Sequence, residues 1–424
     1  MMNLGAASPV TPLGVTGRID WRGPALTAAI AAIVLASFTS AVTLTGGLVA
    51  DDAGATPKLY HAALMLAGAA LALRGRMVRP RVEMVLYFAV TIAATLLAYM
   101  VFEPRVAGIK LLVALGVGLI ATQLGRVSDA RTVVRGCRIA SVAFLIIVTV
   151  KNLQHLPAFV AFLASPLGHP DVPSLSGGGL NLEATWLALS STFLIGTALF
   201  VPFALAAAGT SALYASRAGL VIIGLAGAAA LAHTWGQRRA TRATPAEPRG
   251  TAASRRRRKL ALTLAVTAAT ASTFGLGILT VRQYGDPAYV AQRFATIGDE
   301  PGSMGRLTLW RGGLRVFAKY PLGVGVGNAV PMLRRVLGVD VPEDNLHNIY
   351  LQHAVETGLP GLLVLLAVAM MVGRRLLASR FRDHLLMFVA GYLVAGVIQF
   401  TGVDAILWLV YGLQWGVSRG GAGV

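Results

Sequence analysis

Long apolar runs separated by short polar segments recur along the whole chain of 424 residues. Several runs come close to the roughly 20 residues that an α-helix needs to cross a bilayer. The runs are continuously apolar and do not alternate with polar positions, as the strands of a membrane β-barrel would. The pattern predicts an all-α, polytopic integral membrane protein, with about twelve transmembrane helices and a single membrane domain over residues 1–424.

The placement of basic residues assigns a side of the membrane to each loop, because short cytoplasmic loops are enriched in Lys and Arg. Arg18 and Arg22 place the N-terminus in the cytoplasm, and the basic loop 237–259 must lie there too. The C-terminus is then also cytoplasmic, and residues 282–346 form a helical external segment between the ninth and tenth spans. The expected spans are 24–49, 59–73, 82–101, 106–124, one beginning near Ile139, 182–199, 201–214, 218–235, 260–281, 359–372, 385–403 and 405–417.

The apolar stretch 182–235 follows an external loop and leads into the basic cytoplasmic loop, so it must cross an odd number of times. One helix, at about 1.5 Å of rise per residue, does not fit the stretch. We therefore expect three short helices, with turns at Pro202 and at the Ser216-Arg217 pair. This arrangement puts Arg217 at the external face.

The composition supports a membrane protein and argues against several other classes of protein. Hydrophobic residues make up 55% of the chain and charged residues 13%, against about 25% charged in soluble domains. The net charge of +19 sits mostly in short loops beside the spans, which argues against nucleic acid as a partner. The lone cysteine, Cys137, excludes an internal disulfide and a thiolate metal cluster.

The external segment and the start of the tenth span hold most of the candidate chemistry. Gly323, Gly325 and Gly327 alternate without the spacing of a dinucleotide fingerprint or a Walker loop. They predict a tight turn where the backbone approaches another helix or a substrate. Three nearby acids are expected to be solvated or paired with arginines: Glu343, Asp344 and Glu356.

Arginines suit phosphate oxygens because the guanidinium is a planar, permanently charged fork of donors. Arg217, Arg306 and Arg311 are candidates for that role, although Arg217 could instead snorkel to the headgroups, and Arg306 with Trp310 could anchor an interfacial helix. His347 is a candidate general base or a hydrogen-bonded structural residue. Its separation of six positions from His353 does not suit a metal site.

Several motifs in order resemble the O-antigen ligase family, which comprises bacterial polysaccharide ligases and polymerases. They are Ser216-Arg217, Arg306 with Trp310, Pro-Leu-Gly-Val-Gly-Val-Gly-Asn at 321–328, His-Asn-Ile-Tyr-Leu-Gln at 347–352 and Glu-Thr-Gly-Leu-Pro-Gly at 356–361. The resemblance implies a protein of the bacterial inner membrane with a periplasmic active site. With the arguments above, it gives His347, Arg217 and Arg306 as catalytic residues, Arg311, Trp310, Asn345, Asn348 and Tyr350 as substrate-binding residues, and no cofactor or metal.

The implied reaction moves O-antigen polysaccharide from undecaprenyl diphosphate to a sugar hydroxyl of lipid A-core, with inversion and without a metal. The arginines would stabilise the diphosphate leaving group, and His347 would take the hydroxyl proton. One alternative is a polysaccharide polymerase or a protein O-oligosaccharyltransferase that uses the same donor. Another is a transporter of lipid-linked sugars, although the paired halves with broken helices that transporters often show are absent from the sequence. The pattern leaves the oligomeric state open.

Overall fold

The computed structural model describes residues 22–43, 48, 58–72, 79–105, 107–164, 172–214, 216–241, 301–338, 341, 343, 345–400 and 404–420. The expected span 260–281, Asp344, and most of the basic loop 237–259 lie outside the described residues. The part of the predicted external segment before residue 301 does so as well.

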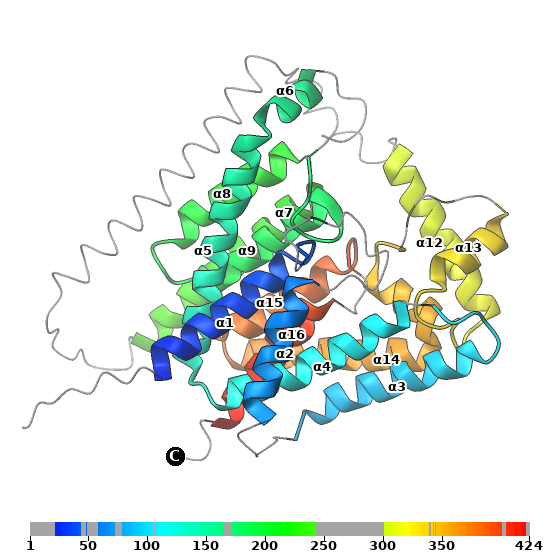
Figure 1. Cartoon of the computed structure of the whole chain (residues 1–424), viewed down its shortest axis with the longest axis horizontal. Coiled ribbons are helices and arrows are strands. Elements are labelled where there is room, and N and C mark those ends of the chain that lie inside the picture. Colours follow the sequence, from blue (N-terminus) through cyan, green and yellow to red (C-terminus); the bar gives the residue numbers. More distant parts are fainter. Residues whose placement is uncertain are drawn as a thin grey trace, which may run out of the picture.

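The described residues form helices, together with two isolated β-bridges, Val42–Leu48 and Thr43–Lys58. The elements are α1 (Arg22–Phe38), α2 (Leu59–Ala72), α3 (Val82–Tyr99), α4 (Ala107–Arg126), α5 (Ala130–Gln154), α6 (Leu156–Ala164), α7 (Gly179–Ser190), the 3-10 helix η1 (Ser191–Leu194), α8 (Phe200–Leu213), α9 (Arg217–Thr241), α12 (Pro301–Lys319), α13 (Ala329–Leu337), α14 (Ile349–Ala378), α15 (His384–Ala395) and α16 (Ala405–Gly420) (Figure 1).

Among the residues that the structure describes, five segments are long and apolar enough to cross a membrane: α3, α4, α5, residues Ala218–Trp235 within α9, and α14. The prediction of a helical, multi-pass membrane protein is therefore confirmed. The count of about twelve spans and the external position of residues 282–346 stay predictions.

The stretch 182–235 contains three α-helices, α7, α8 and α9, with the short 3-10 helix η1 after α7. Three helices were expected there. The break between the first two lies at residues 195–199, before α8, and not at Pro202. Pro202 belongs to the first turn of α8, where a proline is tolerated because the backbone N–H groups of that turn have no partner inside the helix.

Two helices begin earlier than expected. α5 begins at Ala130 and not near Ile139, because Asp129 caps it by accepting the Thr132 N–H at 2.7 Å. The basic residues between these positions therefore lie on a helix and not in a loop. α14 begins at Ile349 and not near residue 359, capped by Asn348, and its first turns carry polar side chains that are buried against other elements.

The helices pack in lengthwise pairs: α16 along α4, α14 along α3, and α1 along α5 (Figure 1). The first pair is in very close contact at Gly412 and Gly416, which are four positions apart on α16. A Cβ at these positions would lie 2.5 Å from the Gly118 carbonyl oxygen and 2.3 Å from the Thr122 carbonyl oxygen, respectively. Small residues at this spacing let helix backbones approach closely in membranes.

Helix ends that the predicted topology assigns to one side of the membrane lie together. Tyr99 at the end of α3 donates its hydroxyl to the Val326 carbonyl at 2.6 Å, beside the start of α14. At the opposite ends of the same two helices, Glu83 Oε1 lies 2.8 Å from Arg375 Nη1. Helices α12 and α13 lie beyond the first of these two ends (Figure 1).

Candidate functional site

The start of α14 holds His347 in an unusual backbone conformation, with φ at 49°. Residues other than glycine rarely adopt this left-handed region, although His does so more often than most. The Asn345 Oδ1 accepts the His347 N–H at 2.7 Å, and the Asn348 Oδ1 accepts the N–H groups of Tyr350 and Leu351, each at 3.0 Å. Two asparagines therefore fix the turn, one on each side of the histidine.

Neighbouring elements fix the same turn from outside. The Leu346 carbonyl accepts the Trp310 Nε1–H of α12 at 2.9 Å, and the Leu346 N–H donates to Gln352 Oε1 at 2.9 Å. The Ile349 N–H donates to the Gly396 carbonyl, beyond α15, at 2.7 Å. Strained backbone persists where the surroundings over-determine it, and such positions cluster at functional sites. The His347 side chain itself is only half-buried.

Helix α12 carries two predicted site residues, Arg306 and Trp310, and Trp310 contacts this turn. Arg306 and Trp310 are four positions apart and share one helix face. Because Trp310 contacts Leu346, the helix that carries Arg306 is held against the His347 turn. Arg311 is exposed, and as the next residue after Trp310 it points to a different face.

Like Trp310 and Asn345, two more of the predicted substrate-binding residues make hydrogen bonds within the protein. The Tyr350 hydroxyl donates to the Leu393 carbonyl of α15 at 2.8 Å. The Asn348 side-chain oxygen is the N-cap of α14. Contacts of either residue with a substrate stay a prediction, as do the roles of the other site residues.

The glycine-rich loop, residues 321–328, packs against α14 at a kink in that helix. Gly358 has a φ of 68°, and Pro360 has no N–H to donate to the Glu356 carbonyl. Backbone groups of the loop replace the missing helix bonds. Val324 N–H donates to the Val355 carbonyl at 2.9 Å, and Gly325 N–H donates to the Glu356 carbonyl at 2.8 Å.

In return, the Leu359 N–H donates to the Pro321 carbonyl at 2.9 Å. The loop also needs its glycines for space: a Cβ on Gly323, whose φ is 93°, would lie 2.5 Å from the Glu356 carbonyl oxygen. The prediction of a tight turn whose backbone approaches another helix is confirmed.

The Glu356 side chain is buried, with 4% of its surface exposed. Its Oε1 accepts the Gly327 N–H at 2.8 Å and the Gln352 Nε2–H at 2.6 Å. The expectation of a solvated or arginine-paired carboxylate was wrong, because the side chain faces the glycine-rich loop and hydrogen-bonds to amides. Gln352 connects Glu356 to the His347 turn through Leu346, so the loop and the turn form one network.

We predict that Gly323→Ala lowers the free energy of unfolding by more than about 2 kcal/mol, because it combines a left-handed φ with a backbone clash. Gly373→Ala, within the α14 helix that the loop contacts, is the control: a Cβ there meets nothing within 4 Å, so the change should be neutral or slightly stabilising. Thermal unfolding of the two purified variants in detergent compares them. Equal melting temperatures would contradict the proposed packing of the loop.

The Ser216-Arg217 pair begins α9. Ser216 is buried, its N–H donates to the Ser211 carbonyl at 2.7 Å, and its Oγ accepts the Gly219 N–H at 3.3 Å. Arg217 is the first residue of the helix. The convergence of its guanidinium with His347 stays a prediction.

Aromatic packing connects the part of the fold that contains α9 with the His347 turn. On α7, which packs against α9, the Trp186 ring stacks on Phe400 with the centroids 4.7 Å apart, and on Tyr392 of α15 at 5.9 Å. The same end of α15 leads to Gly396, whose carbonyl holds Ile349.

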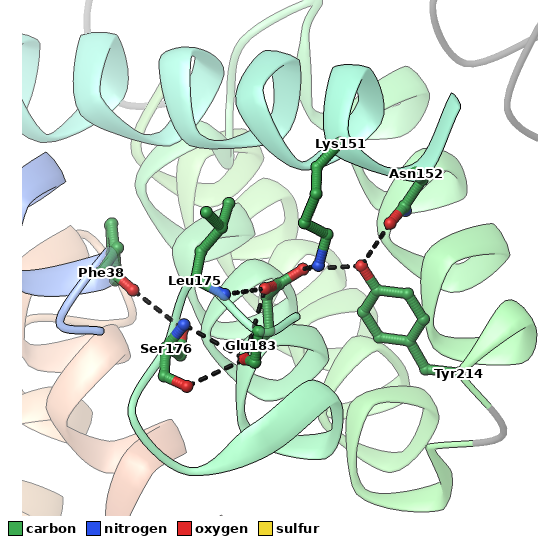
Figure 2. Close-up of polar contacts among 8 residues, drawn as sticks. Phe38, Lys151, Asn152, Leu175, Ser176, Glu183 and Tyr214 are labelled. Carbon is green, nitrogen blue, oxygen red and sulfur yellow. Dashed lines mark hydrogen bonds and ion pairs between the residues drawn. The ribbon is translucent and has the colours of Figure 1, made fainter. Parts of the chain in front are cut away.

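The sequence analysis missed a buried ion pair between Lys151 of α5 and Glu183 of α7, with Nζ and Oε1 2.5 Å apart (Figure 2). The Tyr214 hydroxyl lies 2.6 Å from the same Glu183 oxygen. A signal was present, because each charge interrupts an apolar stretch, and ionisable residues inside membrane segments are rare and usually functional.

Residues 202–366 match the family described as O-antigen ligase. The chain carries an O-antigen ligase domain. This domain runs from α8 into α14 and includes Ser216-Arg217, the Arg306 helix, the glycine-rich loop and the His347 turn. The resemblance found in the motifs is therefore confirmed, and with it ligase- or polymerase-like glycan transfer as the general function. No curated protein matches the sequence.

Proposed function

We propose that this O-antigen ligase family member transfers O-antigen polysaccharide from undecaprenyl diphosphate to a sugar hydroxyl of lipid A-core. The reaction would take place at the periplasmic face of the bacterial inner membrane, with both termini of the chain in the cytoplasm. The single observation that carries the proposal is the His347 turn. It offers a half-buried His347 on a strained backbone whose N–H is held by Asn345, inside a ligase domain.

In the proposed step, the acceptor hydroxyl oxygen attacks the anomeric carbon of the donor sugar. The bond from that carbon to the diphosphate oxygen breaks, and its electron pair leaves with undecaprenyl diphosphate. His347 takes the hydroxyl proton, a contribution typically worth about 10²–10⁴-fold in rate. One direct displacement inverts the anomeric centre.

The leaving diphosphate gains negative charge as the bond breaks. Arg217 and Arg306 are proposed to stabilise it, since preorganised donors in a water-poor site act more strongly than in water. The support for Arg306 is its face shared with Trp310, which contacts the His347 turn. Arg311 is proposed to contact more distant parts of the donor, because its side chain is exposed.

The test is transfer by the purified protein in nanodiscs, given undecaprenyl-diphosphate-linked glycan and lipid A-core. Appearance of glycan on lipid A-core is expected, together with release of undecaprenyl diphosphate. A reaction without lipid A-core serves as the control. Growth of the lipid-linked glycan in that control would instead indicate a polymerase, and transfer to neither acceptor would contradict the proposal.

Deletion of the gene gives an independent answer in cells. Under the proposal, lipid A-core should lose its long chains while lipid-linked polymer accumulates. Single repeat units on the core would indicate a polymerase.

A further inference from the structure

A cluster of four buried polar side chains lies where α5, α7 and α8 meet (Figure 2). Lys151 and Asn152 belong to the last turn of α5, Glu183 to α7, and Tyr214 follows directly after α8. None exposes more than 6% of its surface. Besides the Lys151–Glu183 pair, the Tyr214 hydroxyl lies 2.6 Å from both Glu183 Oε1 and Asn152 Oδ1.

Glu183 is the centre of this cluster. Its second oxygen, Oε2, accepts the Leu175 N–H at 2.7 Å and lies 3.4 Å from Ser174 Oγ. The adjoining Ser176 donates its hydroxyl to the Phe38 carbonyl, at the end of α1, at 2.8 Å. A buried charge is tolerated when it is paired and hydrogen-bonded. This carboxylate meets that condition, and its contacts join the end of α5, the end of α8 and the loop before α7. That loop reaches the end of α1 through Ser176.

Tyr214 connects this cluster to the start of α9, where Arg217 is the first residue. Only residues 215 and 216 separate it from Arg217. The turn that follows is closely packed, because a Cβ on Gly219 would lie 2.3 Å from the Ser211 Oγ. The first turn of α9 therefore has little freedom once the end of α8 is held by the Tyr214 hydroxyl.

We infer that Lys151, Glu183 and Tyr214 form a positioning lock, which sets the place of Arg217 in the proposed transfer reaction. These side chains act through Arg217 and do not touch the substrate, because they are buried among themselves. The inference rests on the proposed function of Arg217. Its physical basis is that a catalytic group displaced by about 1 Å can lose about 100-fold in rate.

A second polar cluster, at the start of α3 and the end of α14, provides a matched control. There, the Tyr411 hydroxyl donates to Glu83 at 3.2 Å, and Glu83 pairs with Arg375. Tyr411→Phe therefore removes a tyrosine hydroxyl that contacts a paired glutamate, as Tyr214→Phe does, but from α16 and not from the end of α8. Tyr214→Phe keeps the ring, which stacks on Phe159 with the centroids 5.7 Å apart, and removes only the oxygen.

The first measurement reports the position of residue 217 directly. Cys137 is the sole cysteine, so Cys137→Ala provides a background in which Arg217→Cys can carry a single spin label. We expect Tyr214→Phe and Glu183→Gln to increase the mobility of that label in nanodiscs, and Tyr411→Phe to leave it unchanged. Unchanged mobility with Tyr214→Phe overturns the lock, whether or not Arg217 is catalytic.

The second measurement tests the coupling to chemistry. With Arg217 intact, Tyr214→Phe should lower kcat about 10-fold or more with little effect on KM, and its melting temperature should match that of Tyr411→Phe. Combined with Arg217→Lys, it should cause little further loss, because residues that act as a unit are non-additive. Additive losses overturn the lock. Increased label mobility together with a fully active Arg217→Lys variant supports the lock and removes Arg217 from the proposed reaction.

Discussion

Replacing His347 with alanine should reduce glycan transfer by at least about 100-fold, because the acceptor hydroxyl then has no positioned base. The protein should remain in the membrane and bind both substrates. The measurement is transfer of glycan from its undecaprenyl diphosphate carrier to lipid A-core by the purified variant, under single-turnover conditions.

His347 also has a backbone role, since its φ is 49°, and an alanine there is strained. The His347→Gly variant separates the two roles, because glycine adopts this conformation freely. We expect the glycine and alanine variants to be equally inactive. Recovery of transfer with His347→Gly would show that the residue matters only for the turn, and the proposed base would be wrong.

The second large effect concerns the arginines. Arg217→Lys and Arg306→Lys should each lower kcat by about 10²–10³-fold, nearly as much as the alanine variants. Lysine keeps the charge but lacks the planar fork that binds two phosphate oxygens at once. The rates should be measured with saturating donor, so that the loss reports on the transition state and not on binding alone.

Arg315→Lys is the control, because Arg315 is an exposed residue on the same α12 helix as Arg306. It should transfer glycan at the unchanged rate. Full turnover in both Arg217→Lys and Arg306→Lys would mean that any positive charge suffices. Loss in the Arg315 variant would mean that the sensitivity belongs to the helix as a whole.

Much of the fold follows from local pattern. Apolar runs bounded by basic residues gave helices at 59–72, 82–99 and 107–126 within a few residues of the expected spans. The charge of the following loop called for an odd number of crossings between residues 182 and 235, the length excluded one helix, and the structure has three α-helices there. Such features depend on hydrophobicity and charge in a single segment, which the sequence displays directly.

The misplaced boundaries involve polar residues inside helices. The start of α5 carries arginines, and the start of α14 carries Gln352, His353 and Glu356, all three buried. Helix boundaries that are predicted from hydropathy alone assign such polar residues to the neighbouring loop. Here the helices continue because asparagine and aspartate caps satisfy their first N–H groups. The polar side chains of α14 also find partners on other elements, as His353 does at Tyr87.

The sequence by itself showed that this is a multi-pass membrane protein, placed most of its helices and revealed the resemblance to the O-antigen ligase family. These features depend on composition or on short ordered motifs. Only the tertiary structure decided that Glu356 bonds to Gly327, that Trp310 holds the His347 turn, and that Lys151 meets Glu183. Each contact joins segments far apart in the chain. Hydrogen bonds between such segments depend on how the helices pack. No local pattern of residues encodes which distant side chains will then lie within hydrogen-bonding distance of one another.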